Sequence, residues 1–473
     1  MSLQALNAAA ARRWSRIGPA FLPFADVASP ELPMGRLLRL SLFQVSVGMA
    51  TVLVVGALNR IMIVELGVSA WLVAVMISLP LVFAPARALV GFKSDTHRSV
   101  LGWRRVPYLW FGTLLQFGGL AIMPFAILLL SGDTTGPAWI GHVAAALGFL
   151  LVGAGLHTVQ TVGLALATDL APAEDHPKVV ALLCIMLLLG MVGFGLFFGW
   201  VLTPFTKVGL IQMVQGTAVL TIMLNGVALW KQEARDPSRT RGDRRQSFRD
   251  TWRRFSTGGQ AKRRLIALGF GTMAFSMQDI LLEPYGGQVL GLSVGTTTAM
   301  TAVLALGAVI GFCVAAARLA RGMDPYRLAG IGALVGLAAF PALIFAAPFN
   351  APGMFAIGVV LTGFGTGLFA HSTLTATMAG AERGHVGITL GIWGAVQATA
   401  AGVAVAAGGL LRDGVGLLAE LGLLGPTLVH PATGYVAVYV IELALLFATL
   451  VAVGPLVRAL PGRASFSATL QGS

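Results

Sequence analysis

The stretch ALVGFKSDTHRSVLGWRRVPY, from Ala88 to Tyr108, decides the fold because it places a polar, basic segment between two long apolar runs. It contains five basic side chains, counting His97, and a turn with Gly91 and Asp95. Lys and Arg residues concentrate in the cytoplasmic loops that join membrane helices. The stretch therefore predicts a short cytoplasmic connection between two membrane-spanning helices.

This loop resembles the connection between the second and third helices of major facilitator superfamily transporters. There a Gly, then an Asp four residues on, then basic residues clamp the helix ends. The residues that carry the resemblance, and that form the expected cytoplasmic loop motif, are Gly91, Asp95, Arg98, Arg104 and Arg105. The resemblance implies an all-α integral membrane protein of twelve helices in two six-helix halves.

The composition agrees with a membrane protein, since 56% of the 473 residues are hydrophobic and only 11% are charged. The formal net charge of +13 would also fit a nucleic-acid-binding protein. That class is disfavoured because the basic residues flank apolar runs and form no separate domain. The solvent of this chain is mostly lipid, and no nucleic-acid partner is expected.

About 20 apolar residues are needed for a helix to cross the hydrocarbon core. Twelve continuous runs meet this length, whereas barrel strands would alternate apolar and polar residues in short segments. The predicted spans are 37–64, 68–92, 107–131, 138–168, 178–203, 207–230, 265–287, 294–317, 326–348, 353–380, 386–411 and 432–455.

The distribution of basic residues predicts that both termini are cytoplasmic, because 28 of the 32 Lys and Arg residues then lie on the inner side. The expected units are a cytoplasmic N-terminal segment with an interfacial helix (1–36), an N-terminal half (37–230), a basic cytoplasmic linker (231–264), a C-terminal half (265–455) and a cytoplasmic tail (456–473). The linker is interpreted as a tether, with anionic lipid or an acidic partner as the alternative.

An internal repeat supports two related halves. The segment NRIMIVELGVS, from Asn59 to Ser69, matches EPYGGQVLGLS, from Glu283 to Ser293, in register. The match places Gly67 opposite Gly291. The Gly-rich runs 190–199 and 402–409 predict close packing of helices in lipid.

A more specific resemblance rests on four segments: FLPFADVASPELPMGRLLRLSLFQ (Phe21–Gln44), LNRIMIVELGV (Leu58–Val68), the loop described above, and TLGIWGAVQATAAG (Thr389–Gly402). These are similar to the PucC/LhaA family, the bacteriochlorophyll delivery branch of the superfamily in purple photosynthetic bacteria. The resemblance implies an assembly factor for light-harvesting antenna in the inner (intracytoplasmic) membrane. The core antenna around the reaction centre is favoured, with the peripheral antenna as the alternative.

The resemblance also implies the ligands and partners. Bacteriochlorophyll is the expected cofactor, with carotenoid as a further candidate. The expected partners are the antenna α and β polypeptides, the reaction centre–antenna complex, bacteriochlorophyll synthase, the protein insertion machinery and membrane lipid.

A neutral imidazole can ligate the magnesium of a pigment. His157 and His371 lie within apolar spans, on corresponding helices of the two halves, and His142 lies nearer the outer end. These three are the pigment-binding candidates. The alternative is a buried histidine bonded to a neighbouring backbone or hydroxyl group.

Ionisable residues within spans are costly in lipid and therefore informative. Glu442, near the middle of the last span, is the candidate for a lateral partner surface, with an internal hydrogen bond as the alternative. The residues expected toward the outer ends of the first span of each half, as cavity or gate groups, are Asn59, Arg60, Glu65, Asp279 and Glu283. Simple ion pairing is the alternative for the charged ones.

Catalysis is not expected, because no Walker-type loop, zinc spacing or Ser/His/Asp constellation is evident and no metal site is predicted. Two classes of function remain. One is a membrane chaperone that binds pigment and antenna helices laterally. The other is a proton-coupled exporter or flippase of a small lipophilic molecule, which would depend on Asp279 or Glu283.

Overall fold

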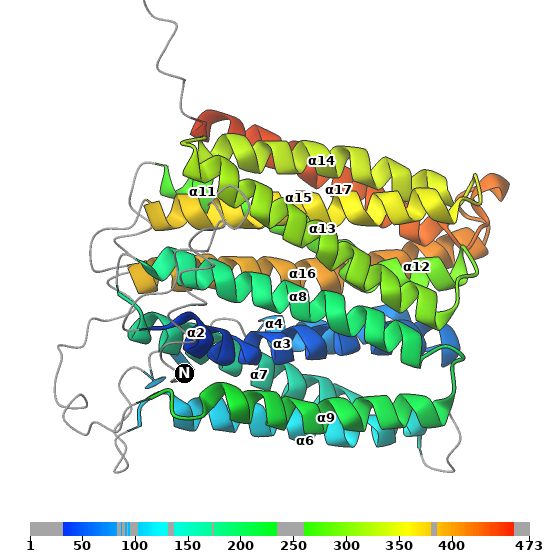
Figure 1. Cartoon of the computed structure of the whole chain (residues 1–473). Helices are drawn as coiled ribbons and strands as arrows, with labels where there is room; N and C mark the ends of the chain where they lie inside the picture. Colours follow the sequence, from blue (N-terminus) through cyan, green and yellow to red (C-terminus); the bar gives the residue numbers. More distant parts are fainter. Residues whose placement is uncertain are drawn as a thin grey trace, which may run out of the picture.

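The computed structural model of the chain describes residues 32–82, 87, 90–91, 93–94, 103–130, 137–172, 175–233, 260–379 and 386–457. Every regular element in these ranges is a helix (Figure 1). Eleven helical spans are long and apolar enough to cross a membrane, and one more, Ala70–Leu81, is apolar but shorter. The protein is therefore a multi-pass membrane protein, and the all-helical, twelve-span architecture predicted from the sequence is confirmed.

The N-terminal half starts with one long span built of four helical segments, because two stretches of it wind as π-helix. Its elements are α2 (Met34–Leu40), α3 (Leu42–Thr51), η1 (Val52–Leu58), η2 (Ile61–Glu65), α4 (Ala70–Val82), α6 (Val106–Leu130), α7 (Ala138–Leu170), α8 (His176–Val201) and α9 (Lys207–Leu229).

The C-terminal half repeats this order, and its first span is also interrupted. Its elements are α11 (Ala261–Ser276), η5 (Met277–Ile280), α12 (Leu282–Gln288), α13 (Val294–Ala320), α14 (Pro325–Ala346), α15 (Pro352–Ala379), α16 (Val386–Glu420), η6 (Pro426–Leu428), α17 (Thr433–Val453) and η7 (Gly454–Leu456). Between α11 and α12 the chain passes through the short 3-10 turn η5, so the seventh span is a broken helix.

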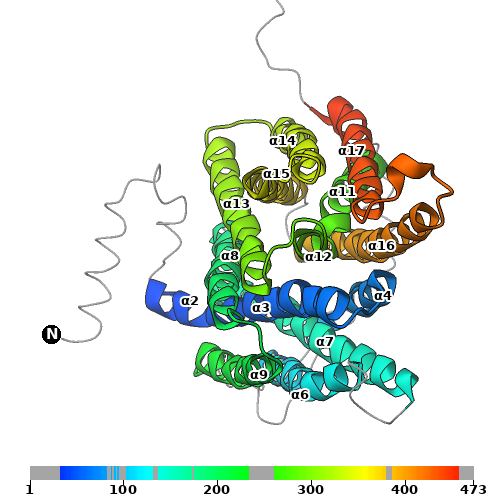
Figure 2. The ribbon, with the colours of Figure 1, turned by 90° about the vertical axis from the view of Figure 1, so that its right-hand side faces the viewer.

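The helices run between two ends of the bundle. The start of α2 lies at the proximal end, toward the left of Figure 1, and α12 lies at the distal end, toward the right. The halves meet where α8 packs along α13 and α4 packs along α16 (Figure 2). A Cβ on Gly195 of α8 would lie 2.8 Å from the Cβ of Ala302 on α13. The Gly-rich run of α8 therefore packs as predicted.

The internal repeat is visible in the backbone. Gly67 has a φ of +66° and Gly291 has a φ of +64°, a left-handed conformation that suits glycine. The next residue in each copy bonds back six positions, from Val68 N to Met62 O and from Leu292 N to Gly286 O, both at 2.9 Å. The predicted register between the two segments is confirmed at these turns.

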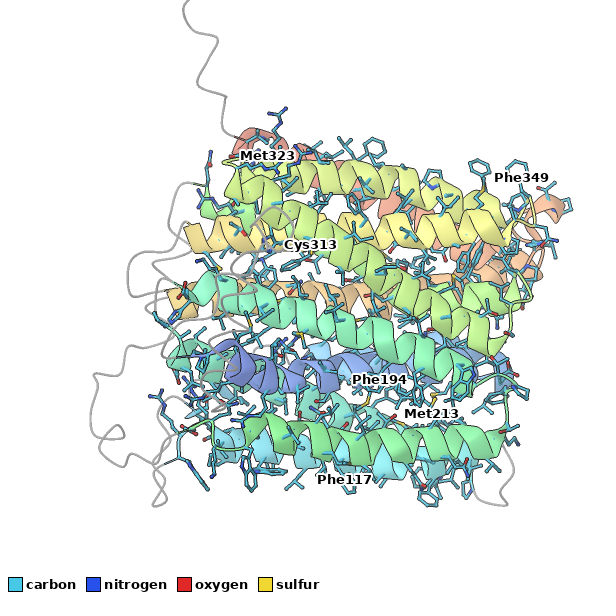
Figure 3. All side chains as sticks on the ribbon, viewed as in Figure 1. Phe117, Phe194, Met213, Cys313, Met323 and Phe349 are labelled. Atoms are coloured by element: carbon cyan, nitrogen blue, oxygen red, sulfur yellow. The ribbon has the colours of Figure 1, made fainter. Side chains whose placement is uncertain are left out.

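Large apolar side chains point outward from the bundle, as lipid-facing residues do. Phe125 is 62% exposed, Trp200 is 74% exposed and Phe349 is 68% exposed. Figure 3 places Phe349 at the distal end and Cys313 within the bundle. Cys313 and Cys184 are both free thiols.

Some predictions fall outside the described residues. They concern the N-terminal interfacial helix, Asp95 and Arg98 of the loop motif, most of the 231–264 linker and most of the tail. The predicted domain boundaries stay predictions.

Candidate functional site

The distal end of the molecule is closed by a buried arginine between the two halves. Arg60, which is 3% exposed, donates from Nη1 to Oε1 of Glu65 at 2.5 Å. Its Nη2 donates to the backbone oxygen of Leu292 at 3.2 Å, across the interface. Gly287 of α12 packs on the guanidinium. Arg60 therefore neutralises an acid in its own half while it holds the other half.

A second contact across the interface is made by Asn59. Its Nδ2 donates to the carbonyl oxygen of Ile280 at 2.7 Å, and the side chain is fully buried. Ile280 ends η5, where the helix break leaves backbone carbonyls without their usual intrahelical partners. Asn59 therefore stabilises the break of the seventh span from the opposite half.

Glu283, on α12, faces the first span at its closest approach. Its carboxylate accepts hydrogen bonds from Thr301 and, at 3.3 Å, from Thr298 of α13. A Cβ on Gly56 would collide with Glu283 Oε1. The structure thus brings Asn59, Arg60 and Glu283 together at the interface between the halves, and their role as a gate stays a prediction.

Glu442 is placed differently from the predicted partner surface. The side chain is 0% exposed, and Oε1 accepts a hydrogen bond from the backbone nitrogen of Gln278 at 2.8 Å. The prediction of Glu442 as part of a lateral partner surface is wrong, and the alternative, an internal hydrogen bond, is observed. The reason is the break: η5 exposes a backbone N–H that α17 satisfies with this carboxyl group.

Asp279 belongs to the same cluster as Glu442. Its Oδ1 accepts from Nε2 of Gln278 at 3.0 Å. Gln278 therefore bridges two carboxyl groups, one through its side chain and one through its backbone. Sequence reasoning identified both acids but not the residue that joins them.

Another distal network was missed by the sequence analysis. Gln288 Oε1 accepts from Arg412 at 2.6 Å and from Tyr435 at 2.5 Å. The neighbour of Arg412, Asp413, accepts from the backbone nitrogen of Trp71 at 2.8 Å. This network caps the start of α4 and joins the halves beside α16. The available signal was the pair of opposite charges at 412–413 in an otherwise apolar span.

His157 lies half-buried on α7 beside an unexpected polar cluster. Arg87 donates to Gln160 Oε1 at 2.8 Å and to Thr161 Oγ1 at 3.2 Å. Arg87 makes no ion pair with any residue in the described part of the chain. Within the same residues the ring of His157 makes no hydrogen bond. Among the residues that the structure describes, Arg87 therefore lies in a span of the first half without an acid that forms an ion pair with it.

His371 and His142 are held in different surroundings. His371 is 8% exposed, and its ring packs on Phe312 with centroids 4.1 Å apart. Its Nδ1 has no hydrogen-bond partner, and neither has the hydroxyl of Ser372 beside it. His142 is half-buried near the distal end of α7. The three histidines do not form one site, and no described residues group three or more metal-ligating side chains.

The proximal end of the first half is held by the expected arginines. Arg105 donates to Asp169 at 3.0 Å and to Ser94 at 2.7 Å, and Arg104 donates to Asp169 at 2.7 Å. Ser94 donates in turn to the backbone oxygen of Gly91 at 2.7 Å. These contacts join the end of the second span to α7, which is the clamp that the loop motif predicts.

A second acid at this end had not been predicted. The carboxylate of Glu233 accepts from the backbone nitrogens of Arg104, Arg105 and Val106 at 2.9–3.0 Å. These are orphan donors at the start of α6, and a carboxylate there also complements the helix dipole. Gln232, the preceding residue, binds Arg36 of α2 at 2.7 and 3.0 Å.

Solved structures of other proteins share the helical fold of this chain. Among solved structures, a D-xylose–proton symporter superposes with a TM-score of 0.66 at 14% identity, covering 87% of this chain and 96% of that one. At that identity the likeness shows the fold alone, which is that of the major facilitator superfamily.

Curated relatives are much closer in sequence. Protein PucC of Rhodovulum sulfidophilum is 57% identical over 417 residues, 87% of this chain and 92% of that protein. An uncharacterized protein of the puhA-bchM intergenic region of Rhodobacter capsulatus is 54% identical over 442 residues, 93% and 92% of the two chains. The family model described as "PUCC protein" matches residues 57–460. The chain therefore belongs to the PUCC protein family.

Proposed function

We propose that this protein is an assembly factor for the light-harvesting antenna of purple photosynthetic bacteria. In this proposal it holds bacteriochlorophyll, with carotenoid as a further ligand, and delivers it to antenna α and β polypeptides as they insert. The proposal rests on membership of the family, on the resemblance of the four quoted segments and on a fold without an evident catalytic constellation. The protein has no enzymatic role in it.

The observation that carries the pigment assignment is the unbonded imidazole of His157. Neutral histidine nitrogens are good ligands for a metal centre, and a ring without a hydrogen-bond partner keeps its nitrogens available. Arg87 lies on the neighbouring span, where its remaining N–H groups could donate to the carbonyls of a macrocycle. His371 fits less well, because its ring is packed against Phe312.

The cavities of the structure bear on where a pigment could sit. One cavity of about 30 Å³ lies beside Arg264, Tyr326 and Trp393, and another of about 200 Å³ lies beside Glu65 and Lys207. Pockets for drug-sized ligands measure roughly 300–1,000 Å³. Neither of these two cavities can enclose a macrocycle. Neither is lined by His157, and we assign the pigment to a helix face beside this residue, open to lipid or to a partner helix.

The orientation in this proposal follows the basic residues. The proximal end, with Arg104 and Arg105, faces the cytoplasm, and the distal gate faces the other side of the inner (intracytoplasmic) membrane. Newly made antenna helices and bacteriochlorophyll synthase would then approach from the side of the proximal clamp. The core complex around the reaction centre is the client that we propose, and the peripheral antenna is the alternative.

A second candidate function is a proton-coupled exporter or flippase of a small lipophilic molecule. It is favoured by one observation, the buried Glu283 in contact with the first span of the opposite half at Gly56. Such a carboxyl group in the interior of a transporter fold is a common proton carrier. In the assembly-factor proposal the same residue only keeps the gate closed.

The test is purification in mild detergent from a photosynthetic host, followed by an absorption spectrum and mass identification of co-eluting polypeptides. The expected result is bacteriochlorophyll bands together with core antenna or reaction-centre polypeptides. His157→Ala should lose most of the pigment, while His430→Ala, in the distal loop, should keep it. Peripheral antenna polypeptides alone would move the client to the peripheral complex.

A colourless preparation without partners would overturn the assembly-factor proposal. The exporter candidate would then be tested with Glu283→Gln in proteoliposomes that carry a proton gradient. Loss of gradient-driven export in that variant would establish the second function.

A further inference from the structure

The break in the seventh span is surrounded by buried oxygen atoms that have no hydrogen-bond donor. The unpartnered atoms are Oε2 of Glu442, Oε1 of Gln278 and the hydroxyl of Tyr439. All three side chains are at most 1% exposed. A buried polar atom without a partner costs on the order of 1–3 kcal/mol. Three such atoms at one helix break indicate that the cluster binds a ligand that can interact with oxygen atoms of carboxyl, amide and hydroxyl groups.

The atoms belong to one connected group. Gln278 binds Asp279 through its side-chain nitrogen and Glu442 through its backbone nitrogen. Asp279 and Glu442 are close enough to repel each other when both are charged. Tyr439 lies one turn before Glu442 on α17 and interacts electrostatically with it. Two carboxyl groups, one amide oxygen and one hydroxyl therefore surround the break.

In the described ranges no basic side chain forms an ion pair with Asp279 or Glu442. The ionisable groups on the elements that pack around it are Glu283 and Tyr285 on α12, Tyr435 on α17, Arg412, Asp413 and Glu420 on α16, Arg60 beside η1, Lys262, Arg263 and Arg264 at the start of α11, and Tyr326 and Arg327 at the start of α14. The two nearest arginines are engaged elsewhere: Arg60 holds Glu65, and Arg412 holds Asp413 and Gln288.

We propose that Asp279, Glu442 and Gln278 form a binding site for one small monovalent cation, either a proton or sodium. Oxygen atoms of carboxyl and amide groups are ligands for hard cations, and a proton on Glu442 would supply the missing donor. Two uncompensated charges cannot be buried together at acceptable cost, so one bound cation reduces the pair to a single negative charge and removes the repulsion between the two carboxylates. Broken helices bind coupling ions in the same way in other transporter folds.

Occupancy of this site would act on the contact between the halves. Asn59 of the first half donates to the carbonyl of Ile280, the last residue of the same short turn. A change in charge at Asp279 and Glu442 can therefore affect the interface through η5. The site goes beyond pigment delivery, because it needs neither pigment nor antenna polypeptide to be observed.

The experiment uses the full-length protein in lipid nanodiscs and measures the thermal unfolding temperature. One arm changes the pH from mildly alkaline to mildly acidic at constant ionic strength. The other arm replaces choline chloride by sodium chloride at constant mildly alkaline pH. A ligand that binds only the folded state raises the unfolding temperature, and a rise of at least about 2 °C is expected in one arm. A response to acid identifies the proton, and a response to sodium identifies sodium.

The variants decide whether the response comes from this site. Glu442→Gln keeps an acceptor for the Gln278 backbone and should remove the response, and Asp279→Asn should reduce it. Glu420→Gln, an exposed carboxyl on α16, should respond like the wild type. Infrared spectra should show a protonated-carboxyl band that Glu442→Gln removes if the proton is the ligand.

Two results would overturn the proposal. One is a wild type whose unfolding temperature responds in neither arm. The other is a change in unfolding temperature that is as large in Glu442→Gln and in Asp279→Asn as in the wild type. If Glu442→Gln does not fold, the single variants Asp279→Asn and Tyr439→Phe take its place. Tyr439→Phe removes only a hydroxyl group and should shift the response of the unfolding temperature to acid or sodium.

Discussion

The side-chain nitrogen of Asn59 donates a hydrogen bond of 2.7 Å to the carbonyl of Ile280, 221 positions further along the chain. The bond joins the first span of one half to the broken first span of the other. A single amide side chain thus satisfies a backbone group that the break leaves open. Together with Arg60 it adds polar contacts between the halves at the distal end, beside the packing of α8 on α13 and of α4 on α16.

Replacing Asn59 by Leu should weaken this closure. The carbonyl of Ile280 would lose its donor while remaining buried, which costs about 1–3 kcal/mol. We expect a lower unfolding temperature in nanodiscs. Glu420→Ala, at an exposed site, is the control. An unchanged unfolding temperature would show that the bond does not hold the halves.

The Arg60–Glu65 pair should behave as a coupled unit. Glu65 is 34% exposed whereas Arg60 is 4% exposed, so removing the acid leaves a buried charge with only a backbone partner. We expect Glu65→Gln to destabilise by about 1–2 kcal/mol, less than a fully buried pair, because water screens the acid. The double variant with Arg60→Gln should be less destabilised than the sum of the two single variants. Additive losses in the double-mutant cycle would contradict the pairing.

Much of the fold could be predicted because it depends on local signals. The length and continuity of the apolar runs place the spans, and the repeated Gly67 and Gly291 place two equivalent turns. Arg104 and Arg105 of the loop motif lie at the helix ends, although their partner Asp169 was not predicted. The spans and the turns follow from the length of apolar helix that lipid requires and from the backbone conformations that glycine allows.

The partners of the site residues could not be predicted. A helix that is apolar all round, such as α17, gives no indication of which face is buried, so the orientation of Glu442 could not be read from the sequence. The same holds for Glu233, whose three partners lie 127–129 positions away. The break at η5 had only a faint signal, the polar run from Ser276 to Asp279.

The cap formed by Glu233 should be essential for the proximal clamp. Three backbone N–H groups at the start of α6 depend on this carboxylate, and loss of a helix cap costs about 0.5–2 kcal/mol. Glu233→Ala should therefore increase hydrogen exchange in the first turn of α6. Glu233→Gln keeps one acceptor oxygen and should have a smaller effect. Equal exchange in the wild type and Glu233→Ala would contradict the capping role.

The contact between α8 and α13 offers the sharpest steric test, because two nearby glycines differ in their surroundings. A side chain on Gly195 would meet the backbone nitrogen of Ala302 at 3.0 Å as well as its Cβ, whereas a side chain on Gly193 would meet nothing within 4 Å. Gly195→Val should therefore push the halves apart and lower the unfolding temperature, since overpacking costs about 1–3 kcal/mol.

Gly193→Ala should leave stability unchanged or raise it, because alanine is favoured over glycine in a helix by about 1 kcal/mol. The comparison separates crowding at the interface from a general effect of added methyl groups. If both variants unfold at the wild-type temperature, α8 and α13 are not in close contact in the membrane. If both are destabilised equally, the loss arises within α8 itself and not from the contact between the halves.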